Sequence, residues 1–266
     1  MWRRCMLAEP TERFLRELAT ASDLHAASSL LAQFSRSLPA PRAGFDYDIA
    51  NPGLPGNGDS EPLGVELGWP SEFVRRWVKG GMVLACPLAI PCRKRWRPFT
   101  WSMDEDNLGL EGDELPRPFT AMGQQALSLL RQAGVRSGIL VPVHQPGGRT
   151  GFVSWVSDRP HDEMRRWAQD YASELFVVAH AFLERVDAML NANAAAREDC
   201  PLTERERECL TWVARGKTDS EIGIIIDRSP ETARFHVRNA IAKLDASSRS
   251  HAVAKAMRRG WLGAIE

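Results

Sequence analysis

The chain has 266 residues, 44% of them hydrophobic and 26% charged, and 34 Lys and Arg residues balance 34 Asp and Glu residues. This length allows two domains, and the composition is that of an ordinary folded protein. It contains no apolar run near the roughly 18 residues that span a bilayer and no apolar core near the N-terminus, so we expect neither a membrane span nor a signal peptide.

The N-terminal part of the chain mixes helical and extended patterns. Apolar residues at helical spacing predict amphipathic helices over residues 11–19 and 23–34, and Asp23 can cap the second helix. Residues 43–50 alternate in polarity and predict a strand, whereas the Gly and Pro content of residues 51–68 predicts a loop.

The middle of the chain continues this mixture. Residues 70–79 predict a helix with Phe73 and Trp77 on its apolar side. Residues 86–118, rich in Pro and acids, predict a loop with short elements, and residues 119–133 predict a helix closed by a glycine.

A hairpin and a long helix follow. Residues 138–144 and 150–157 predict two strands around a Pro-Gly-Gly turn, and residues 160–191 predict one long helix that serves either in dimerisation or in packing within the domain. We expect residues 1–190 to form an α/β/α sandwich, a sensor-like domain, followed by a linker over residues 191–200.

Residues 201–266 are expected to form an all-α domain of four helices. Thr203, Thr218 and Ser229 can cap the first three helices, Thr203 within a capping box, and residues 250–259 predict the fourth. The whole chain is therefore α+β in class. From Cys200 onward 12 Lys and Arg residues face 9 acids, so this end carries +3 and the rest of the chain −3.

The third of these helices exposes residues suited to DNA. Its outer face carries Arg234, Phe235 and Arg238. A helix fits the major groove, and arginines one turn apart can reach phosphates and guanine edges. The hydroxyls and cap amides of Thr218, Ser229 and Thr232 can bind phosphate. The alternative from spacing alone is a plain four-helix bundle with solvated arginines.

Residues 201–260 resemble the LuxR-type helix-turn-helix throughout and without a gap. The segments that carry the resemblance are residues 202–210, 214–218, 221–222, 229–233, 235–239, 243–244 and 252–253. Glu206, Leu210 and Gly216 match the family's most characteristic positions, whereas Gly223 stands where the family usually has Ala. The resemblance implies DNA contacts at Arg234, Phe235 and Arg238, double-stranded promoter DNA as partner, and a homodimer that binds paired half-sites, with RNA polymerase as a further partner.

The region around residues 69–101 is similar to the autoinducer-binding domain of LuxR-type quorum-sensing regulators. The similarity continues through residues 133–139 and 141–143. It makes the following residues candidates for a ligand pocket: Phe73, Trp77, Cys86, Pro87, Trp96, Phe99, Trp101 and Gly138. The aromatic members of this set are alternatively simple core residues.

The departures from that family concern the groups that hold the ligand. Relatives that bind lactones have Trp where Phe73 stands, Asp where Cys86 stands and Tyr where Trp77 stands, whereas Pro87 and Trp101 match, as does Gly138. Phe has no donor and a thiol is a poor acceptor. Losing both anchors costs about 2–4 kcal/mol of binding free energy. We therefore expect a transcriptional regulator that ordinary acyl-homoserine lactones do not gate.

Other functions are open at this point. The regulator could be gated by a different small apolar ligand, or could antagonise lactone-binding relatives through mixed dimers. An enzyme would use Cys86 as nucleophile and His144 or His161 as base, but no catalytic motif supports it. The five scattered cysteines predict reduced thiols in a cytoplasmic protein, and Cys86 and Cys92 lack partners at zinc-finger spacing, so we expect no metal ion and no cofactor.

Overall fold

The computed structural model describes residues 8–50, 60–103, 109–110, 113–114, 119–145, 148–195 and 200–262. The chain divides into two compact units. The first holds the described residues of 8–144 and 150–193, and the second holds the described residues from 194 onward. Residues 191–195 of the expected linker belong to the preceding long helix instead, and residues 196–199 lie outside the described residues. No helix in the described part of the chain has the length and apolar character that a bilayer crossing needs.

The first unit is built on one mixed-length sheet. Its strand order is β1-β6-β5-β2-β3-β4, with antiparallel pairing of β1 to β6, β5 to β2, β2 to β3 and β3 to β4. The strands are β1 (Arg42–Asp46), β2 (Phe99–Ser102), β3 (Gly109–Leu110), β4 (Asp113–Glu114), β5 (Ser137–Gln145) and β6 (Arg149–Ser157). The expected hairpin is present as the long neighbours β5 and β6, and its turn residues 146–147 lie outside the described residues.

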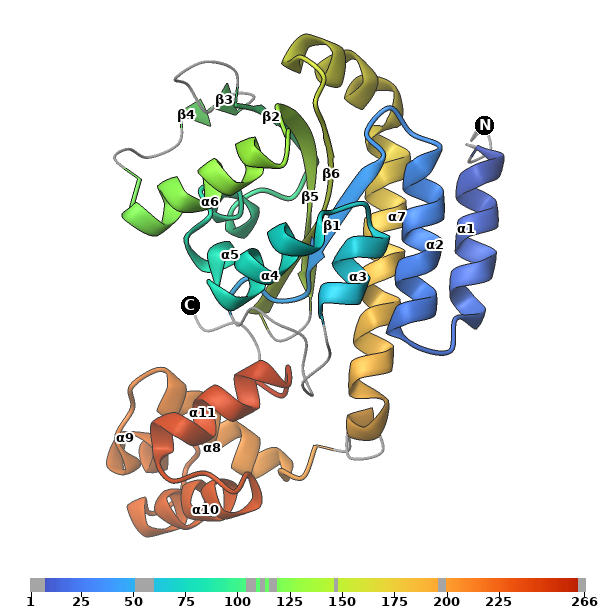
Figure 1. Cartoon of the computed structure of the whole chain (residues 1–266). Coiled ribbons are helices and arrows are strands. Elements are labelled where there is room, and N and C mark those ends of the chain that lie inside the picture. Colours follow the sequence, from blue (N-terminus) through green and yellow to red (C-terminus); the bar gives the residue numbers. More distant parts are fainter. Residues whose placement is uncertain are drawn as a thin grey trace, which may run out of the picture. The chain divides into compact units, whose positions relative to one another are not determined.

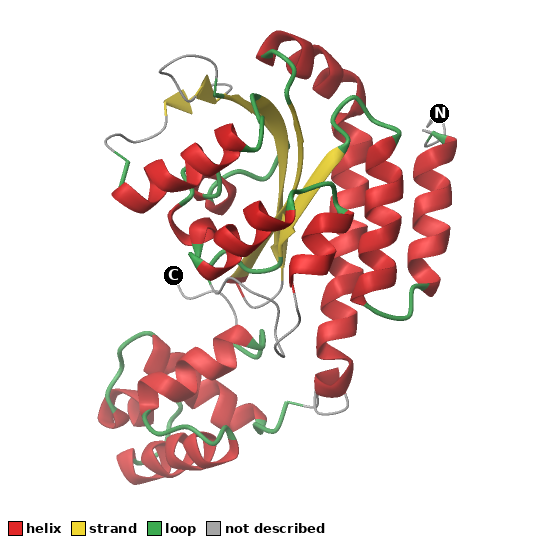
Figure 2. Cartoon of the chain, viewed as in Figure 1, coloured by secondary structure: helices red, strands yellow, loops and turns green. Residues whose placement is uncertain are grey.

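Helices cover both faces of this sheet (Figures 1 and 2). One face carries α1 (Glu9–Thr20), α2 (Leu24–Arg36) and α7 (His161–Ala195). The other carries α3 (Ser60–Glu66), α4 (Ser71–Lys79), α5 (Met82–Ala85) and α6 (Ala121–Gln132), with a 3-10 turn at Ile90–Arg93. The expected α+β class with a helix-sheet-helix first domain is confirmed.

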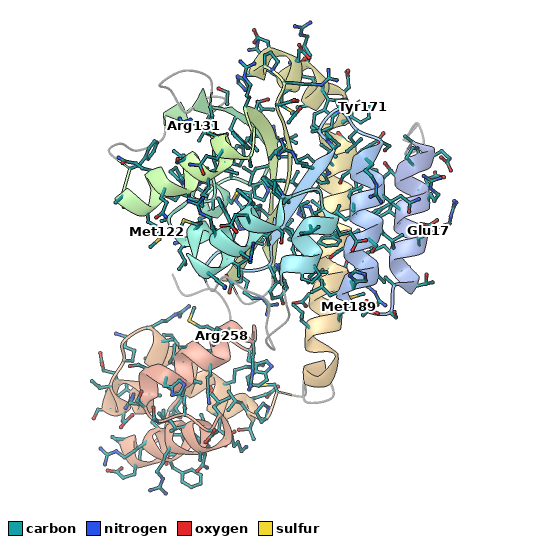
Figure 3. The ribbon with its side chains drawn as sticks, in the orientation of Figure 1. Glu17, Met122, Arg131, Tyr171, Met189 and Arg258 are labelled. Atoms are coloured by element: carbon teal, nitrogen blue, oxygen red, sulfur yellow. The ribbon has the colours of Figure 1, made fainter. Side chains whose placement is uncertain are left out.

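The core on the α7 side explains why the long helix forms where it does. Leu175, Phe182 and Val186 of α7 are fully buried, and Trp155 of β6 is buried between the sheet and α2. The indole Nε1 of Trp155 donates a hydrogen bond to Ser35 Oγ of α2 at 2.9 Å. Side chains lie on both sides of the sheet (Figure 3). The apolar face of α7 thus packs within its own unit.

Two local expectations were wrong. Part of the segment predicted as a loop forms α3, because Leu63 is buried and Gly64 lets Val74 of α4 approach so closely that an added Cβ would lie 2.6 Å from it. Residues 51–59 of that segment lie outside the described residues. The strand predicted to reach residue 50 ends at Asp46, because Asp46 and Asp48 accept the backbone N–H groups two residues on, at 3.0 and 3.1 Å, which turns the chain.

The second unit is helical. It consists of α8 (Glu204–Ala214), α9 (Asp219–Ile225), α10 (Pro230–Lys243) and α11 (Arg249–Arg258). The N-caps predicted at Thr203, Thr218 and Ser229 are confirmed, each accepting the backbone N–H three residues on. Leu210 and Ile222 are fully buried in two small apolar clusters. The caps and these clusters fix the lengths and packing of the short helices.

Glycine at position 223 has a packing consequence. A Cβ added there would lie 2.9 Å from the carbonyl oxygen of Arg228, in the turn that leads to α10. Glycine in a helix costs up to about 1 kcal/mol against alanine. Here it also lets the turn between α9 and α10 pack closely against α9, whereas the Cβ of an alanine would push the backbone of this turn away.

Candidate functional site

The exposed face of α10 carries the residues expected to meet DNA. The side chain of Arg234 is 72% exposed, Phe235 is 52% exposed, and Arg238 is exposed as well. Ala233 and Val237 on the opposite face are buried against the other helices. The helix is therefore held by its inner face, and its cationic and aromatic side chains are presented to solvent.

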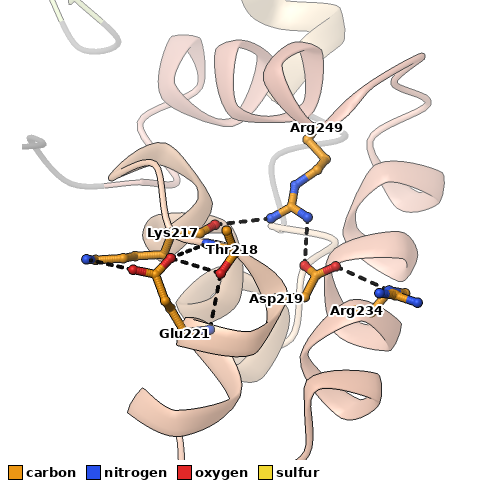
Figure 4. Close-up of polar contacts among 6 residues, drawn as sticks. All are labelled: Lys217, Thr218, Asp219, Glu221, Arg234 and Arg249. Carbon is orange, nitrogen blue, oxygen red and sulfur yellow. Dashed lines mark hydrogen bonds and ion pairs between the residues drawn. The ribbon is translucent and has the colours of Figure 1, made fainter.

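An acidic residue joins three helices next to this face (Figure 4). Asp219, the first residue of α9, accepts from Arg234 Nε of α10 at 3.3 Å and from an Arg249 guanidinium nitrogen of α11 at 2.6 Å. Arg249 also donates to the carbonyl of Lys217 at 3.4 Å. These contacts fix the direction in which Arg234 leaves α10 and tie α9 to α11.

Two of the three hydroxyl residues of the predicted interface, Thr218 and Ser229, are N-caps, and the third, Thr232, bonds to Ser229. Thr218 Oγ1 accepts from the Glu221 backbone N–H and donates to the Glu221 carboxylate at 2.9 Å (Figure 4). Ser229 Oγ accepts from the Thr232 backbone N–H at 3.2 Å and lies 3.0 Å from the Thr232 hydroxyl. A phosphate that binds these hydroxyls has to replace contacts that the caps already make.

A buried acid couples α8 to the end of α10. Glu206 is 3% exposed, accepts from the Thr203 backbone N–H at 2.8 Å and from Lys243 Nζ at 2.7 Å. Burial by itself would raise the pKa of Glu206, but the hydrogen bonds from Lys243 and Thr203 outweigh it and lower the pKa below its ordinary value. Glu206 is thus ionised at neutral pH and anchors the C-terminal turn of α10.

The first unit contains a cavity of about 240 Å³ between the sheet and the helices α3 to α5. Four of the residues predicted for a pocket line it: Phe73, Trp77, Cys86 and Trp101. The other four predicted residues are absent from its lining: Pro87, Trp96, Phe99 and Gly138. Further lining residues that the sequence did not single out include Asp46, Trp69 and Ser154.

The four residues outside the lining have other positions. Pro87 and Phe99 are buried, whereas Trp96 is 70% exposed and its ring lies on His144 with centroids 4.0 Å apart. Gly138 pairs with Trp101 across β5 and β2, and a Cβ there would lie 2.7 Å from the Trp101 ring. Gly138 therefore makes room for Trp101 against the sheet instead of touching the cavity.

Phe73 belongs to a stack of aromatic rings along the cavity wall. Its ring lies between Trp69 and Trp77, with centroid separations of 4.4 and 5.3 Å and interplanar angles of 14° and 22°. The indole Nε1 of Trp69 donates to the Ala43 carbonyl of β1. At the centre of this stack, Phe73 offers the cavity a ring and no hydrogen-bond donor.

Cys86 is a buried neutral thiol. It is 4% exposed, and burial raises its pKa to about 11. At neutral pH it is neither a good acceptor nor an activated nucleophile. The two histidines considered as bases have other partners: His144 Nε2 lies 2.9 Å from the Arg95 carbonyl, and His161 Nε2 lies 3.2 Å from Thr100 Oγ1. Cys86, Cys92, Cys200 and Cys209 are all free thiols.

The residues that sequence reasoning missed share one property. Asp46, Trp69, Asp219 and Arg249 gain their places through contacts between elements far apart in the chain. The strand alternation that puts Asp46 on a defined face was visible in the sequence, but the element packed against that face was not. For Asp219 and Arg249, 30 residues apart, no spacing signal exists.

A unit with the helix-turn-helix arrangement and a unit with a mainly apolar cavity are together typical of a DNA-binding regulator with a sensor-like domain. Residues 23–186 match the family described as "Autoinducer binding domain", and residues 200–256 match "Bacterial regulatory proteins, luxR family". The chain belongs to the LuxR family of quorum-sensing transcriptional regulators. The matching domains and relatives are regulators, so the chain is not an enzyme.

Individual relatives support this assignment. VanR, a transcriptional activator protein of Vibrio anguillarum, is 31% identical over 205 residues, which cover 76% of this chain and 78% of VanR. Putative HTH-type transcriptional regulator y4qH of Sinorhizobium fredii is 32% identical over 203 residues, 76% of this chain. The match spans 57% of the length of y4qH.

Solved structures share the fold. SdiA of Escherichia coli superposes with a TM-score of 0.58 at 18% identity, covering 96% of this chain and 98% of SdiA. A second SdiA structure, in complex with octanoyl-rac-glycerol, gives a TM-score of 0.57 at 18% identity, with 96% of each chain covered.

Proposed function

We propose that this protein is a sequence-specific transcriptional regulator that binds promoter DNA through α10 and is not gated by ordinary acyl-homoserine lactones. Arg234 and Arg238 contact bases or phosphates, Phe235 packs against the DNA, and the hydroxyl and amide groups of Thr218, Ser229 and Thr232 meet the DNA backbone. Residues 1–190 form the sensor and dimerisation domain and residues 201–266 the DNA-binding domain.

The proposal on gating rests on one observation: the two positions that anchor a lactone in relatives are apolar or neutral here and are packed as such. Phe73 is stacked between two indole rings, and the Cys86 thiol is buried with a raised pKa. A lactone amide and carbonyl placed beside them would lose hydrogen bonds to water without replacement, at about 1–3 kcal/mol for each unpaired group.

A homodimer is the oligomer that we propose for DNA binding, because paired half-sites about one helical turn apart are read by two-fold symmetric proteins. RNA polymerase is a further expected partner at the promoter. Since the partner DNA is chromosomal, we place the protein in the cytoplasm.

A second candidate function is gating by a different small, mainly apolar molecule. The observation that favours it is the cavity of about 240 Å³, which persists although both lactone anchors are replaced. A third possibility, an antagonist that acts only in mixed dimers, is less favoured because the DNA-reading face of α10 is complete.

A genomic footprint tests the main proposal. Protein is purified from a host that makes no lactones, and its binding sites are mapped with and without added acyl-homoserine lactones. We expect specific sites whose occupancy the lactones leave unchanged. Specific binding that requires a lactone would overturn the proposed gating, and the absence of any specific site for the purified protein would favour the mixed-dimer antagonist.

A further inference from the structure

The cavity lining contains a carboxyl group. Asp46 faces Phe152 across the β1–β6 pair, and Gly44, two residues earlier, faces Ser154. A Cβ on Gly44 would lie 3.6 Å from the indole Nε1 of Trp69, so this face of β1 looks toward the helices that close the cavity. Residues two apart in a strand share a face. The side chain of Asp46 therefore projects from the sheet on the cavity side.

Only one of the two oxygens of this carboxyl group accepts a hydrogen bond within the described part of the chain. Asp46 Oδ1 accepts the Asp48 backbone N–H at 3.0 Å, whereas Oδ2 has no hydrogen-bond or ion-pair partner among the residues that the structure describes. Burial raises the pKa of Asp46 to about 7; the bond from the Asp48 N–H opposes this, and the Asp48 charge adds to it. A half-buried carboxyl without a cationic partner is costly, and such groups are often found at functional positions.

The other polar groups of the lining are mostly engaged within the protein. Ser154 Oγ donates to the Gly44 carbonyl at 3.2 Å, and Trp69 Nε1 donates to Ala43. Trp101 is the exception: it is 1% exposed, and its indole N–H has no partner in the described part of the chain. The Trp101 N–H is itself covered by protein atoms, so the apolar lining offers a ligand one open acceptor, at Asp46.

We propose that the cavity binds an uncharged, mainly apolar molecule that carries a hydroxyl group, and that this hydroxyl binds Oδ2 of Asp46. A hydroxyl fits either protonation state of the carboxyl, because it donates to the carboxylate and accepts from the acid. The proposal rests on the second candidate function, that the cavity admits a ligand.

Matched ligands test it by isothermal titration calorimetry on the full chain. The probes are monooctanoylglycerol, its dimethyl ether with the same acyl chain and no hydroxyl, octylamine and octanoyl-homoserine lactone. We expect monooctanoylglycerol to bind at least about tenfold more tightly than the ether, which is the loss of one hydrogen bond to a charged group. Asp46→Leu abolishes this preference, and the control Asp162→Asn, an exposed acid outside the lining, keeps it.

Besides a failure of every probe to bind, three outcomes overturn the proposal. They are equal affinity for the alcohol and the ether, a preference that survives in a folded Asp46→Leu protein, and tighter binding of octylamine than of the alcohol. The comparison of alcohol and ether uses the unmodified protein. It therefore tests the proposal even if the Asp46→Leu protein does not fold. If no probe binds, the inference also fails. Lactone-independent DNA binding is tested separately, by the genomic footprint.

Discussion

At the scale of single residues, the reading face of α10 separates two kinds of arginine. Arg234 is oriented by Asp219, whereas Arg238 has no hydrogen-bond or ion-pair partner among the described residues. Arg238 is therefore the better residue with which to test base or phosphate contact, because it loses no hydrogen bond within the protein when it binds DNA.

We expect Arg238→Ala to lower the affinity for a specific site by about 1–3 kcal/mol, the value of a good base contact. Fluorescence anisotropy with a labelled promoter fragment measures the change. Arg207→Ala, an exposed arginine on α8, is the matched control and is expected to bind as the parent does. If both variants lose affinity equally, the effect is one of net charge and α10 is not the reader.

The neutral state of Cys86 leads to a second prediction at this scale. With the thiol buried and its pKa raised to about 11, iodoacetamide is expected to leave Cys86 unmodified in the folded protein and to modify it in urea. Peptide mass spectrometry measures the extent. Rapid labelling of Cys86 in the native state would show that the cavity wall opens to solvent.

Replacing the Cys86 thiol by a carboxyl group tests the hypothesis that this position can no longer hold the charged group that anchors a lactone in relatives. Cys86→Asp buries an ionisable group with no cationic partner, and we expect it to destabilise the first unit by about 2–4 kcal/mol. Thermal unfolding followed by near-ultraviolet circular dichroism measures the loss. Unchanged stability would mean that a polar partner is available at position 86, which would weaken the case against lactone gating.

At the scale of elements, the caps and one buried acid decide how the short helices of the second unit hold together. All four of its helices begin with a side-chain cap, and Glu206 joins the first turn of α8 to Lys243 at the end of α10. Helices this short are marginal in isolation, so their stability depends on such contacts and on packing.

We expect Glu206→Ala to lower the free energy of unfolding of the second unit by about 1–2 kcal/mol, through loss of the reciprocal cap and of the Lys243 bond. Glu208→Ala, whose partner Arg205 is exposed, is the control and is expected to change little. Urea unfolding followed by far-ultraviolet circular dichroism measures both. If both variants lower the free energy of unfolding equally, Glu206 acts only through the net charge of the unit and not through its specific hydrogen bonds.

The same residue sets a pH dependence. Because the folded-state pKa of Glu206 lies below its ordinary value of 4.5, its contribution is complete above about that pH and is lost as the pH falls through the folded pKa. The parent is therefore expected to lose stability in acid more steeply than Glu206→Ala. Parallel acid titrations of the two proteins would contradict this assignment.

At the scale of the whole molecule, two units with separate cores predict separate unfolding. The apolar clusters of the second unit draw on its own helices, from Leu202 to Leu262. We expect a fragment of residues 200–266 to fold alone and to unfold in one cooperative transition. Calorimetry measures it, and a fragment that stays unfolded would mean that the domain division is wrong.

The sequence by itself determined the class of this protein and most of its elements. Helical periodicity, strand alternation and cap residues are local, so they predicted the helices, the β5–β6 hairpin and the caps at Thr203, Thr218 and Ser229. The exposed face of α10 followed from the same periodicity. Errors occurred where a distant contact decided the outcome, as at α3, which forms because Gly64 packs against Val74.

Only the tertiary structure decided which residues meet. Of the eight predicted pocket residues, four line the cavity, because the face that a side chain takes depends on what packs against its strand or helix. Asp46 joins Phe73 and Trp101 in that lining, and Asp219 joins Arg234 and Arg249, across separations in the chain that no local pattern encodes. Local energetics thus set the elements, and long-range packing set the sites.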